Sequence, residues 1–219
     1  AARASTMGFG MIPDLVFDNA IADPQFAAIP DLFTLITYMF VHAGWMHLIS
    51  NMAFWWVFGD NIEDKLGHIP FLIFYLVCGV GADLAQFAVD PWSPVATIGA
   101  SGAIAGVMGA YLLLFPKAKV DIFLFLIVIF RIFPIPAWVM LGLWFALQAV
   151  QSLGSFSTTG GGVAYWAHSG GFVIGLVLIV PFWLRLGGTS FWQRTRGHPD
   201  HPPAKYPLIE SRIPNVRRK

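Results

Sequence analysis

Charged side chains are scarce in this chain. They make up 11% of its 219 residues, whereas a soluble domain of this size carries about 25%. Hydrophobic residues make up 57%, and the mean hydropathy is +0.67. The shortage excludes an ordinary water-soluble domain, because too few polar groups are present to cover its surface. We therefore expect an all-α, polytopic membrane protein, since helices satisfy their own backbone hydrogen bonds in lipid.

Cysteine is nearly absent as well. Cys78 is the only one, so the chain cannot form an internal disulfide. Its place in an apolar run indicates a small packing residue. No cleavable signal peptide is visible either, because residues 1–30 lack a basic stretch followed by an apolar core.

Five apolar stretches are candidates for membrane spans, each of which needs about 20 residues or somewhat fewer. A sixth, 120–135, is interrupted by Arg131 and two prolines. We expect it to be a membrane-surface or re-entrant piece, with a separate span as the less favoured alternative. The five stretches run from about Trp45 to Gly59, Pro70 to Ala88, Ser101 to Phe115, Pro136 to Leu153 and Val163 to Leu184.

Basic residues segregate to one side when these spans cross alternately. Arg3 falls on the opposite side, and the positive-inside rule makes the basic side cytoplasmic. We expect an extracytoplasmic N-terminal loop segment (1–44), a transmembrane domain (45–186) and a disordered basic cytoplasmic tail (187–219). The basic side holds Lys65, Lys117, Lys119, Arg131, Arg185, Arg194, Arg196, Lys205, Arg212, Arg217, Arg218 and Lys219.

Strongly polar groups inside membrane spans are costly and point to function by default, and four such residues are our candidates. His47 and Asn51 are four residues apart and share one helix face. Ser101 opens the third span, and His168 lies in the fifth. The topology places all four near the outer ends of their helices, and hence at similar depth.

Small residues line the third and fifth spans in stripes that let two helix backbones approach closely. Gly102, Gly106 and Gly109 form one stripe, and Gly171 and Gly175 form the other. If the stripes pack together, Ser101 and His168 come within hydrogen-bond reach. A neutral histidine suits the removal of a serine proton near pH 7.

An oxyanion could be held near the same place, by free N–H groups of 99–102 and the side chains of His47 and Asn51. Each residue also has a plainer interpretation. Ser101 alone is more often a packing residue, and a membrane histidine or asparagine often bonds two helices. A metal site of His42, His47 and His168 is disfavoured, because five residues turn His42 and His47 about 140° apart on a helix.

Taken together, the polar and glycine motifs resemble the rhomboid family of intramembrane serine proteases. The matching segments are His42–Asn51, Gly59–Glu63, Gly99–Gly102 and Ala167–Gly171 with Gly175. The resemblance covers about 30–185 and implies a rhomboid-like bundle. It also implies that Ser101 is the nucleophile and His168 the base, without a carboxylate. The oxyanion hole it implies consists of His47, Asn51 and the backbone N–H of Ser101.

Three features depart from the family pattern. The helix that precedes the outer loop has no counterpart in this sequence, so we expect the chain to be a fragment or a processed product. Phe33-Thr34 replaces a Trp-Arg pair that is common in that loop. Ala105 stands where some members carry an aromatic residue that packs on the catalytic histidine.

The resemblance implies a serine endopeptidase without cofactor or bound metal, whose partners are transmembrane protein substrates and the lipid bilayer, not nucleic acid. We expect it in a bacterial plasma membrane, with its C-terminus cytoplasmic. The alternative is an inactive rhomboid-like protein that binds or routes membrane proteins, which intact Ser101 and His168 disfavour. A small channel or transporter is a third possibility, weakened by the lack of internal repeats and mid-membrane acidic residues.

Overall fold

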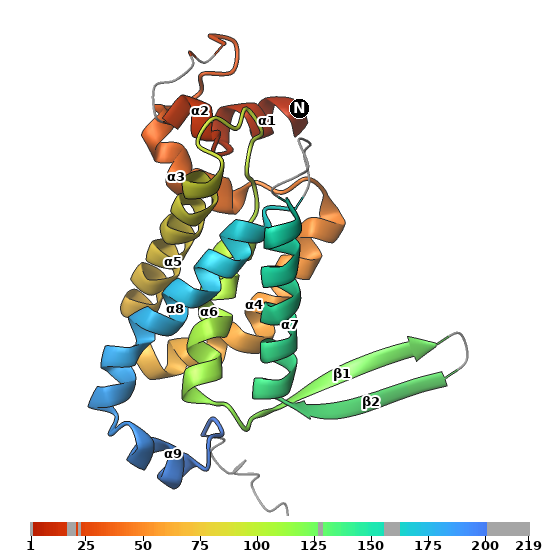
Figure 1. The fold of residues 1–219 in the computed structure, drawn as a ribbon, viewed down its shortest axis with the longest axis vertical. Coiled ribbons are helices and arrows are strands. Elements are labelled where there is room, and N and C mark those ends of the chain that lie inside the picture. The colour runs from red at the N-terminus through yellow and green to blue at the C-terminus, as the bar shows by residue number, and fades with distance from the viewer. Residues whose placement is uncertain (1, 17–20, 22, 127–128, 156–162, 201–219) are drawn as a thin grey trace, which may run out of the picture.

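The computed structural model describes residues 2–16, 21, 23–126, 129–155 and 163–200, and it is built mainly from helices (Figure 1). The five predicted apolar stretches coincide with five helices, so the predicted helical fold class is confirmed. These helices are α4 (Trp45–Leu66), α5 (His68–Val89), α6 (Ser101–Leu114), α7 (Ala137–Gly154) and α8 (Tyr165–Arg185).

Not all five helices reach the length of a membrane span. By length and composition, α5, α7 and α8 each qualify. α4 qualifies only together with Asp31–Phe40, from which it is bent by 80°. α6 has 14 residues, about 21 Å at 1.5 Å per residue, which is shorter than a hydrocarbon core of about 30 Å. The described part of the chain therefore holds three full spans, a bent fourth and one short helix, where we predicted five spans.

The short helix α6 is the centre of the bundle and contacts α4, α5, α7 and α8 (Figure 1). Eleven of its 14 residues are buried. It meets α8 through glycines: a Cβ at Gly106 would lie 3.1 Å from the carbonyl oxygen of Gly171, and one at Gly175 would overlap the backbone of Gly106. The predicted packing of the two stripes is confirmed, since only backbones without side chains approach so closely.

The N-terminal segment covers one end of the bundle (Figure 1). Met11 and Thr97 exchange two backbone hydrogen bonds, of 3.0 and 2.7 Å, and the N–H of Gly99 donates to the carbonyl oxygen of Tyr38 at 2.9 Å. These bonds fix the loop that leads into α6. The segment contains α1 (Ala2–Phe9), α2 (Pro13–Val16), η1 (Asp31–Phe33), α3 (Thr34–Thr37) and η2 (Tyr38–Phe40).

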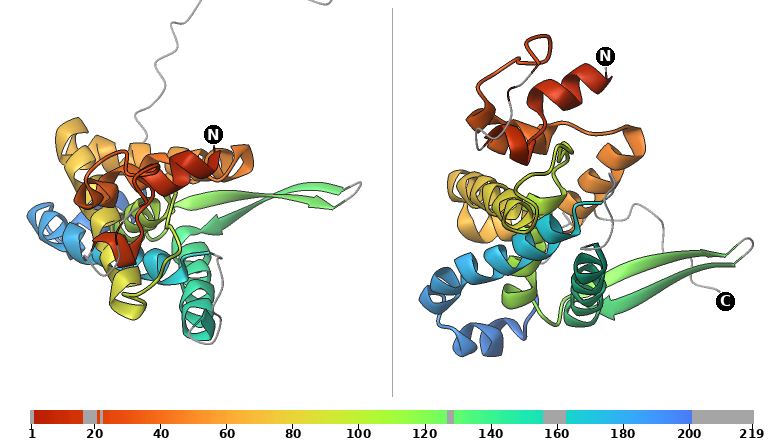
Figure 2. Two further views of the ribbon diagram at one scale, coloured as in Figure 1. Left: turned by 90° about the horizontal axis from the view of Figure 1, so that it is seen from above. Right: turned by 45° about the horizontal axis from the view of Figure 1, so that its top comes forward.

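Segment 120–135 lies in a two-stranded antiparallel hairpin instead of a helix. β1 (Lys119–Leu126) pairs with β2 (Ile129–Pro136), with Lys119 opposite Pro136. The hairpin extends away from the helices in all three views (Figures 1 and 2). β-branched and aromatic residues favour strands, and prolines are tolerated on a strand that lacks a second neighbour. The alternative of a separate helical span is therefore wrong.

The first part of the predicted disordered tail is ordered. Residues 189–195 form α9 (Thr189–Thr195), in which Phe191 is buried. The indole N–H of Trp192 donates to the carbonyl oxygen of Leu113 at 2.8 Å, which ties α9 to the end of α6. Two large aromatic side chains give this basic stretch enough apolar surface to pack. Residues 201–219 lie outside the described part of the chain.

Asp83 is buried in α5, six residues before the end of the helix. It is 0% exposed, and neither carboxyl oxygen has a hydrogen-bond partner among the described residues. Tyr38, whose hydroxyl donates to the carbonyl oxygen of Gly79 at 2.9 Å, covers this face of α5 one turn earlier. The N-terminal segment thus shields a helix end that the sequence alone leaves open.

Candidate functional site

Ser101 and His168 lie together at the contact between α6 and α8. Ser101 is the first residue of α6, and His168 lies in the first turn of α8. The hydroxyl oxygen Oγ of Ser101 is 2.7 Å from Nε2 of His168, within the range of an O–H···N hydrogen bond. Gly102 and Gly171 follow shortly after them, and a Cβ at Gly171 would overlap the carbonyl oxygen of Gly102. The glycine stripes thus bring the two side chains together.

His47 and Asn51 approach the same place from α4. A Cβ at Gly99 would lie 2.7 Å from Nε2 of His47 and 3.6 Å from Nδ2 of Asn51. Both nitrogens therefore face the backbone two residues before Ser101. Asn51 is 6% exposed, and its Nδ2 has no hydrogen-bond partner among the described residues. Its Nδ2 therefore donates no hydrogen bond between helices, which was the plainer interpretation of this residue.

The backbone before α4 orients the imidazole of His47. The N–H of Ala43 donates to Nδ1 of His47 at 3.3 Å, so the neutral ring carries its proton on Nε2, the atom that faces Gly99. Nε2 of His47 and Nδ2 of Asn51 are then both donors. The first turn of α6 adds N–H groups that have no acceptor within the helix, including that of Ser101. Such donors suit a negative oxygen that develops beside Ser101.

His42 lies closer to His47 than helical spacing suggests. Their ring centroids are 5.1 Å apart in an edge-on contact, because α4 begins only at Trp45 and His42 precedes the helix. The 140° argument therefore does not apply to this pair. Among the described residues, no group of three His, Cys, Asp or Glu side chains is arranged to hold a metal ion.

Two residues of α7 contact His168, and the sequence analysis missed both. Oε1 of Gln148 lies 2.9 Å from Nδ1 of His168. The ring of Trp144 lies 6.2 Å from the imidazole, tilted by 34°. Trp144 is therefore an aromatic neighbour of the imidazole. Ala105, which stands where some family members carry such an aromatic residue, is fully buried within α6. The rule that selected His47 and Asn51, polar groups inside an apolar span, also selects Gln148.

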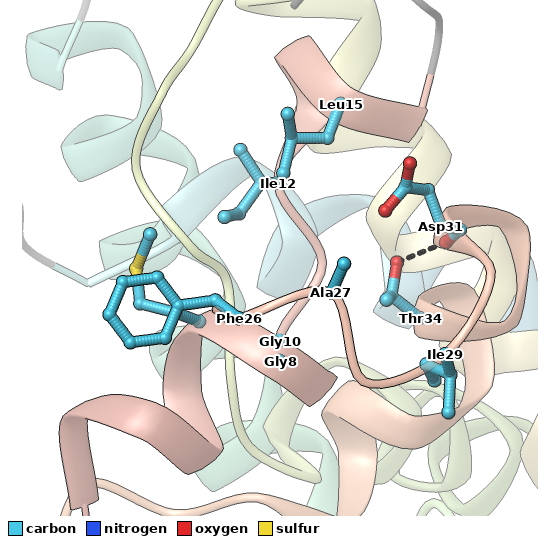
Figure 3. Close-up of a pocket in the computed structure, with 10 residues that line it drawn as sticks. Gly8, Gly10, Ile12, Leu15, Phe26, Ala27, Ile29, Asp31 and Thr34 are labelled. Atoms are coloured by element: carbon cyan, nitrogen blue, oxygen red, sulfur yellow. Dashed lines mark hydrogen bonds between the residues drawn. The ribbon is translucent and has the colours of Figure 1, made fainter. Parts of the chain in front are cut away.

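A small pocket in the N-terminal segment lies apart from these residues (Figure 3). Asp31 and Thr34 are part of its lining. The hydroxyl of Thr34 donates to the carbonyl oxygen of Asp31 at 2.5 Å. Thr34, which replaces the arginine of the common Trp-Arg pair, thus bonds within its own turn. Neither Ser101 nor His168 lines this pocket.

The arrangement has the parts that acyl transfer requires. The hydroxyl of Ser101 lies beside an imidazole nitrogen that can accept its proton. The side-chain nitrogens of His47 and Asn51 face Gly99, two residues earlier in the chain, and N–H groups without a helical acceptor begin α6. The glycine at position 99 keeps that space free of side chains.

The known proteins that this chain resembles are rhomboid proteins. The profile of the Rhomboid domain matches residues 30–185, more than half of the chain. Rhomboid protein 1, mitochondrial, of Saccharomyces cerevisiae is 31% identical over 153 residues, 66% of this chain and 40% of that protein. Rhomboid-like protein 11, chloroplastic, of Arabidopsis thaliana is 40% identical over 77 residues, 35% of this chain and 27% of that protein.

The putative rhomboid protease YdcA of Bacillus subtilis is 37% identical over 78 residues, 36% of this chain and 39% of that protein. The chain therefore spans less than half the length of each of these relatives. Two of the three matches cover little more than a third of this chain, whereas the domain profile covers the whole helical bundle from α4 to α8. On this evidence the chain is an integral membrane protein that belongs to the rhomboid family.

Proposed function

We propose that this protein is an intramembrane serine protease that hydrolyses peptide bonds in or near the transmembrane segments of other proteins. The observation that carries the proposal is the 2.7 Å contact between Ser101 Oγ and His168 Nε2. Membership of the rhomboid family and relatives named rhomboid protease support it.

In the proposed reaction, Oγ of Ser101 attacks the carbonyl carbon of the peptide bond while Nε2 of His168 takes the hydroxyl proton. The carbonyl oxygen becomes an oxyanion, which accepts hydrogen bonds from His47, Asn51 and the N–H of Ser101. His168 then gives its proton to the leaving amine, and the C–N bond breaks. A water molecule, deprotonated by His168, hydrolyses the remaining ester and restores Ser101.

The short length of α6 supports a site within the membrane. Because α6 is about 9 Å shorter than a hydrocarbon core, a helix that reaches one surface begins below the other. Ser101 is the residue at which α6 begins. A recessed nucleophile meets a peptide bond that is itself in or near a membrane segment, which favours transmembrane proteins as substrates.

We infer the orientation from charge. The basic residues around Lys65, Lys117 and Arg185 lie at helix ends opposite those of Ser101 and His168, so the site opens to the extracytoplasmic side under the positive-inside rule. The relatives are named from mitochondria, chloroplasts and a bacterium. They therefore do not favour the expected bacterial plasma membrane over an organelle membrane.

Labelling with a serine-reactive fluorophosphonate tests the proposal on detergent-purified protein. We expect the wild type to be labelled at Ser101 and to cleave a model transmembrane substrate. Ser101→Ala and His168→Ala each abolish cleavage and leave the melting temperature unchanged. Because the two residues act as a unit, the double variant is scarcely worse than either single one.

An inactive rhomboid-like binding protein predicts a different result. Such a protein would bind a transmembrane segment equally well with serine or alanine at position 101, and it would not be labelled. Full cleavage in either single variant would exclude the proposed mechanism.

A further inference from the structure

We propose that Gln148 is a third member of the site, a positioning residue that orients His168, an inference that rests on the protease function proposed above. Oε1 of Gln148 lies 2.9 Å from Nδ1 of His168. On the other side of the same ring, Nε2 lies 2.7 Å from Oγ of Ser101. The three side chains form one chain of hydrogen bonds across α6, α8 and α7.

The direction of these bonds determines which nitrogen of His168 is basic. A carboxamide oxygen only accepts hydrogen bonds, so Nδ1 of His168 carries the ring proton and donates it to Gln148. Nε2 then has a free lone pair, which accepts the hydroxyl proton of Ser101. Without an acceptor at position 148, the neutral ring is free to carry its proton on Nε2, and that tautomer cannot act as the base. The geometry resembles that of an aspartate in a Ser-His-Asp triad.

Contacts along α7 hold the amide in this orientation. Nε2 of Gln148 lies 3.4 Å from Oε1 of Gln151, its acceptor, which leaves Oε1 to face His168. One turn later, the hydroxyl of Ser152 donates to the backbone oxygen of Gln148 at 2.8 Å. Ser152 is fully buried, and its Oγ lies 3.0 Å from that of Ser169, the residue after His168. Ser152 thus links the backbone of Gln148 to α8 at the residue that follows His168.

A neutral amide differs from a carboxylate in its effect on charge. It fixes the tautomer without placing a negative charge inside the membrane, which is costly. It also gives less support to the positive imidazolium that forms during the reaction. The titratable group that acts on His168 from the packed helices is His47 of α4, whereas Ser101, Gln148 and Trp144 present no charge. A carboxylate at position 148 is therefore expected to move the acid limb of the pH profile to higher pH.

Two substitutions separate orientation from packing. Gln148→Leu removes the acceptor and leaves a good helix former of similar size in its place. Gln148→Glu keeps an oxygen at the same place and adds a negative charge. Gln193→Leu and Gln193→Glu are matched controls, because Gln193 is exposed on α9 at the opposite end of α8. The measurements are kcat and KM for a model transmembrane substrate, the rate of fluorophosphonate labelling, the pH profile of both, and the melting temperature.

We expect Gln148→Leu to lower kcat and the labelling rate roughly 10- to 100-fold. This is the range for residues that orient a metal-binding histidine through its second ring nitrogen. KM and the melting temperature change little. Gln148→Glu restores most of the activity at high pH and moves the acid limb of the profile to higher pH, since a carboxylate stabilises the imidazolium. Neither Gln193 variant changes kcat. Gln148→Leu adds nothing to the defect of His168→Ala.

Different results would overturn the protease mechanism and the positioning role of Gln148. Labelling that persists in Ser101→Ala overturns both the protease mechanism and the role of Gln148. Loss of labelling in Ser101→Ala with normal kcat in Gln148→Leu overturns the positioning role alone. Equal losses in Gln148→Leu and Gln148→Glu at every pH, with lowered melting temperatures, mean that Gln148 is a packing residue and also overturn it.

Discussion

Gly99 faces the imidazole of His47 so closely that no side chain fits between them. A Cβ at position 99 would lie 2.6 Å from Cε1 and 2.7 Å from Nε2 of His47. The backbone of Gly99 also has a φ of +112°, which side chains disfavour. The space beside His47 and Asn51, where we place the oxyanion, is therefore open because residue 99 has no side chain.

Gly99→Ala is expected to abolish cleavage and fluorophosphonate labelling. The new methyl group displaces His47 and strains the turn into α6, so the donors no longer face Ser101. Gly142→Ala is the control, because a Cβ at Gly142 of α7 has no atom within 4 Å. Paired labelling rates of the two purified variants check this prediction. Normal labelling of Gly99→Ala would show that the oxyanion is held elsewhere.

Gly175→Ala tests whether glycine packing positions the base. A Cβ at Gly175 would overlap the backbone of Gly106, so α8 must shift away from α6. Such overpacking costs about 1–3 kcal/mol. We expect a lower melting temperature and, since His168 moves with α8, slower labelling of Ser101. Gly142→Ala again serves as the control. An unchanged melting temperature would contradict the tight α6–α8 contact.

Much of this architecture could be predicted from sequence because membrane helices are encoded locally. Hydropathy located the five helices, and glycine spacing identified the α6–α8 interface. Two separate patterns also agreed on Ser101 and His168. One is the cost of a polar side chain inside a membrane span, and the other is the helical phase of the glycine stripes. These features depend on neighbours one or two turns apart, which a single sequence displays.

Features that depend on tertiary contacts could not be predicted in the same way. Gln148 and Trp144 lie on α7; the cost of a polar group in a span marks Gln148 as a candidate, but nothing in the helix indicates that either residue faces His168. Asp83 is buried by the N-terminal segment, whose position over α5 has no local signal. The sequence of the hairpin β1–β2 is apolar like that of a membrane span, and only the pairing of its two strands distinguishes the hairpin from a helix. α9 depends on the contact of Trp192 with the end of α6.

Asp83→Ala is expected to raise the melting temperature. A buried acceptor without a partner costs about 1–3 kcal/mol, and alanine removes both unpaired oxygens. Asp90→Ala is a control for acid removal, because Asp90 follows α5 and is exposed. Labelling of Ser101 should be normal in both variants. A large fall in the melting temperature of Asp83→Ala would mean that the carboxyl group has a bound partner.

Cysteine accessibility tests the orientation inferred from charge. The wild type gives little background, since Cys78 is fully buried. We expect Val95→Cys, in the loop before α6, to react with a membrane-impermeant maleimide in intact cells. Gln193→Cys, on α9, should react only after permeabilisation. Position 157, in the outer loop expected between α7 and α8, lies outside the described residues. The reverse pattern would invert the topology.

Asn51→Ala separates an oxyanion role from a packing role. Removing one oxyanion donor typically lowers turnover about 10²–10³-fold, or roughly 2.7–4 kcal/mol. A hydrogen bond between membrane helices is worth about 0.6 kcal/mol on average. Nδ2 of Asn51 has no partner among the described residues, so its loss breaks no such bond in the resting protein. We therefore expect a strong fall in kcat and in the labelling rate, with little change in melting temperature.

Asn61→Ala is the matched control, because Asn61 lies on the same helix and its Nδ2 donates to Oδ1 of Asp60 at 2.9 Å, away from the site. Turnover and melting temperature are measured together for both variants. The difference matters because a donor that acts only as charge develops leaves the folded state unchanged when it is removed. A large fall in the melting temperature of Asn51→Ala with near-normal turnover would make Asn51 structural. His47 and the backbone N–H groups at the start of α6 would then hold the oxyanion alone.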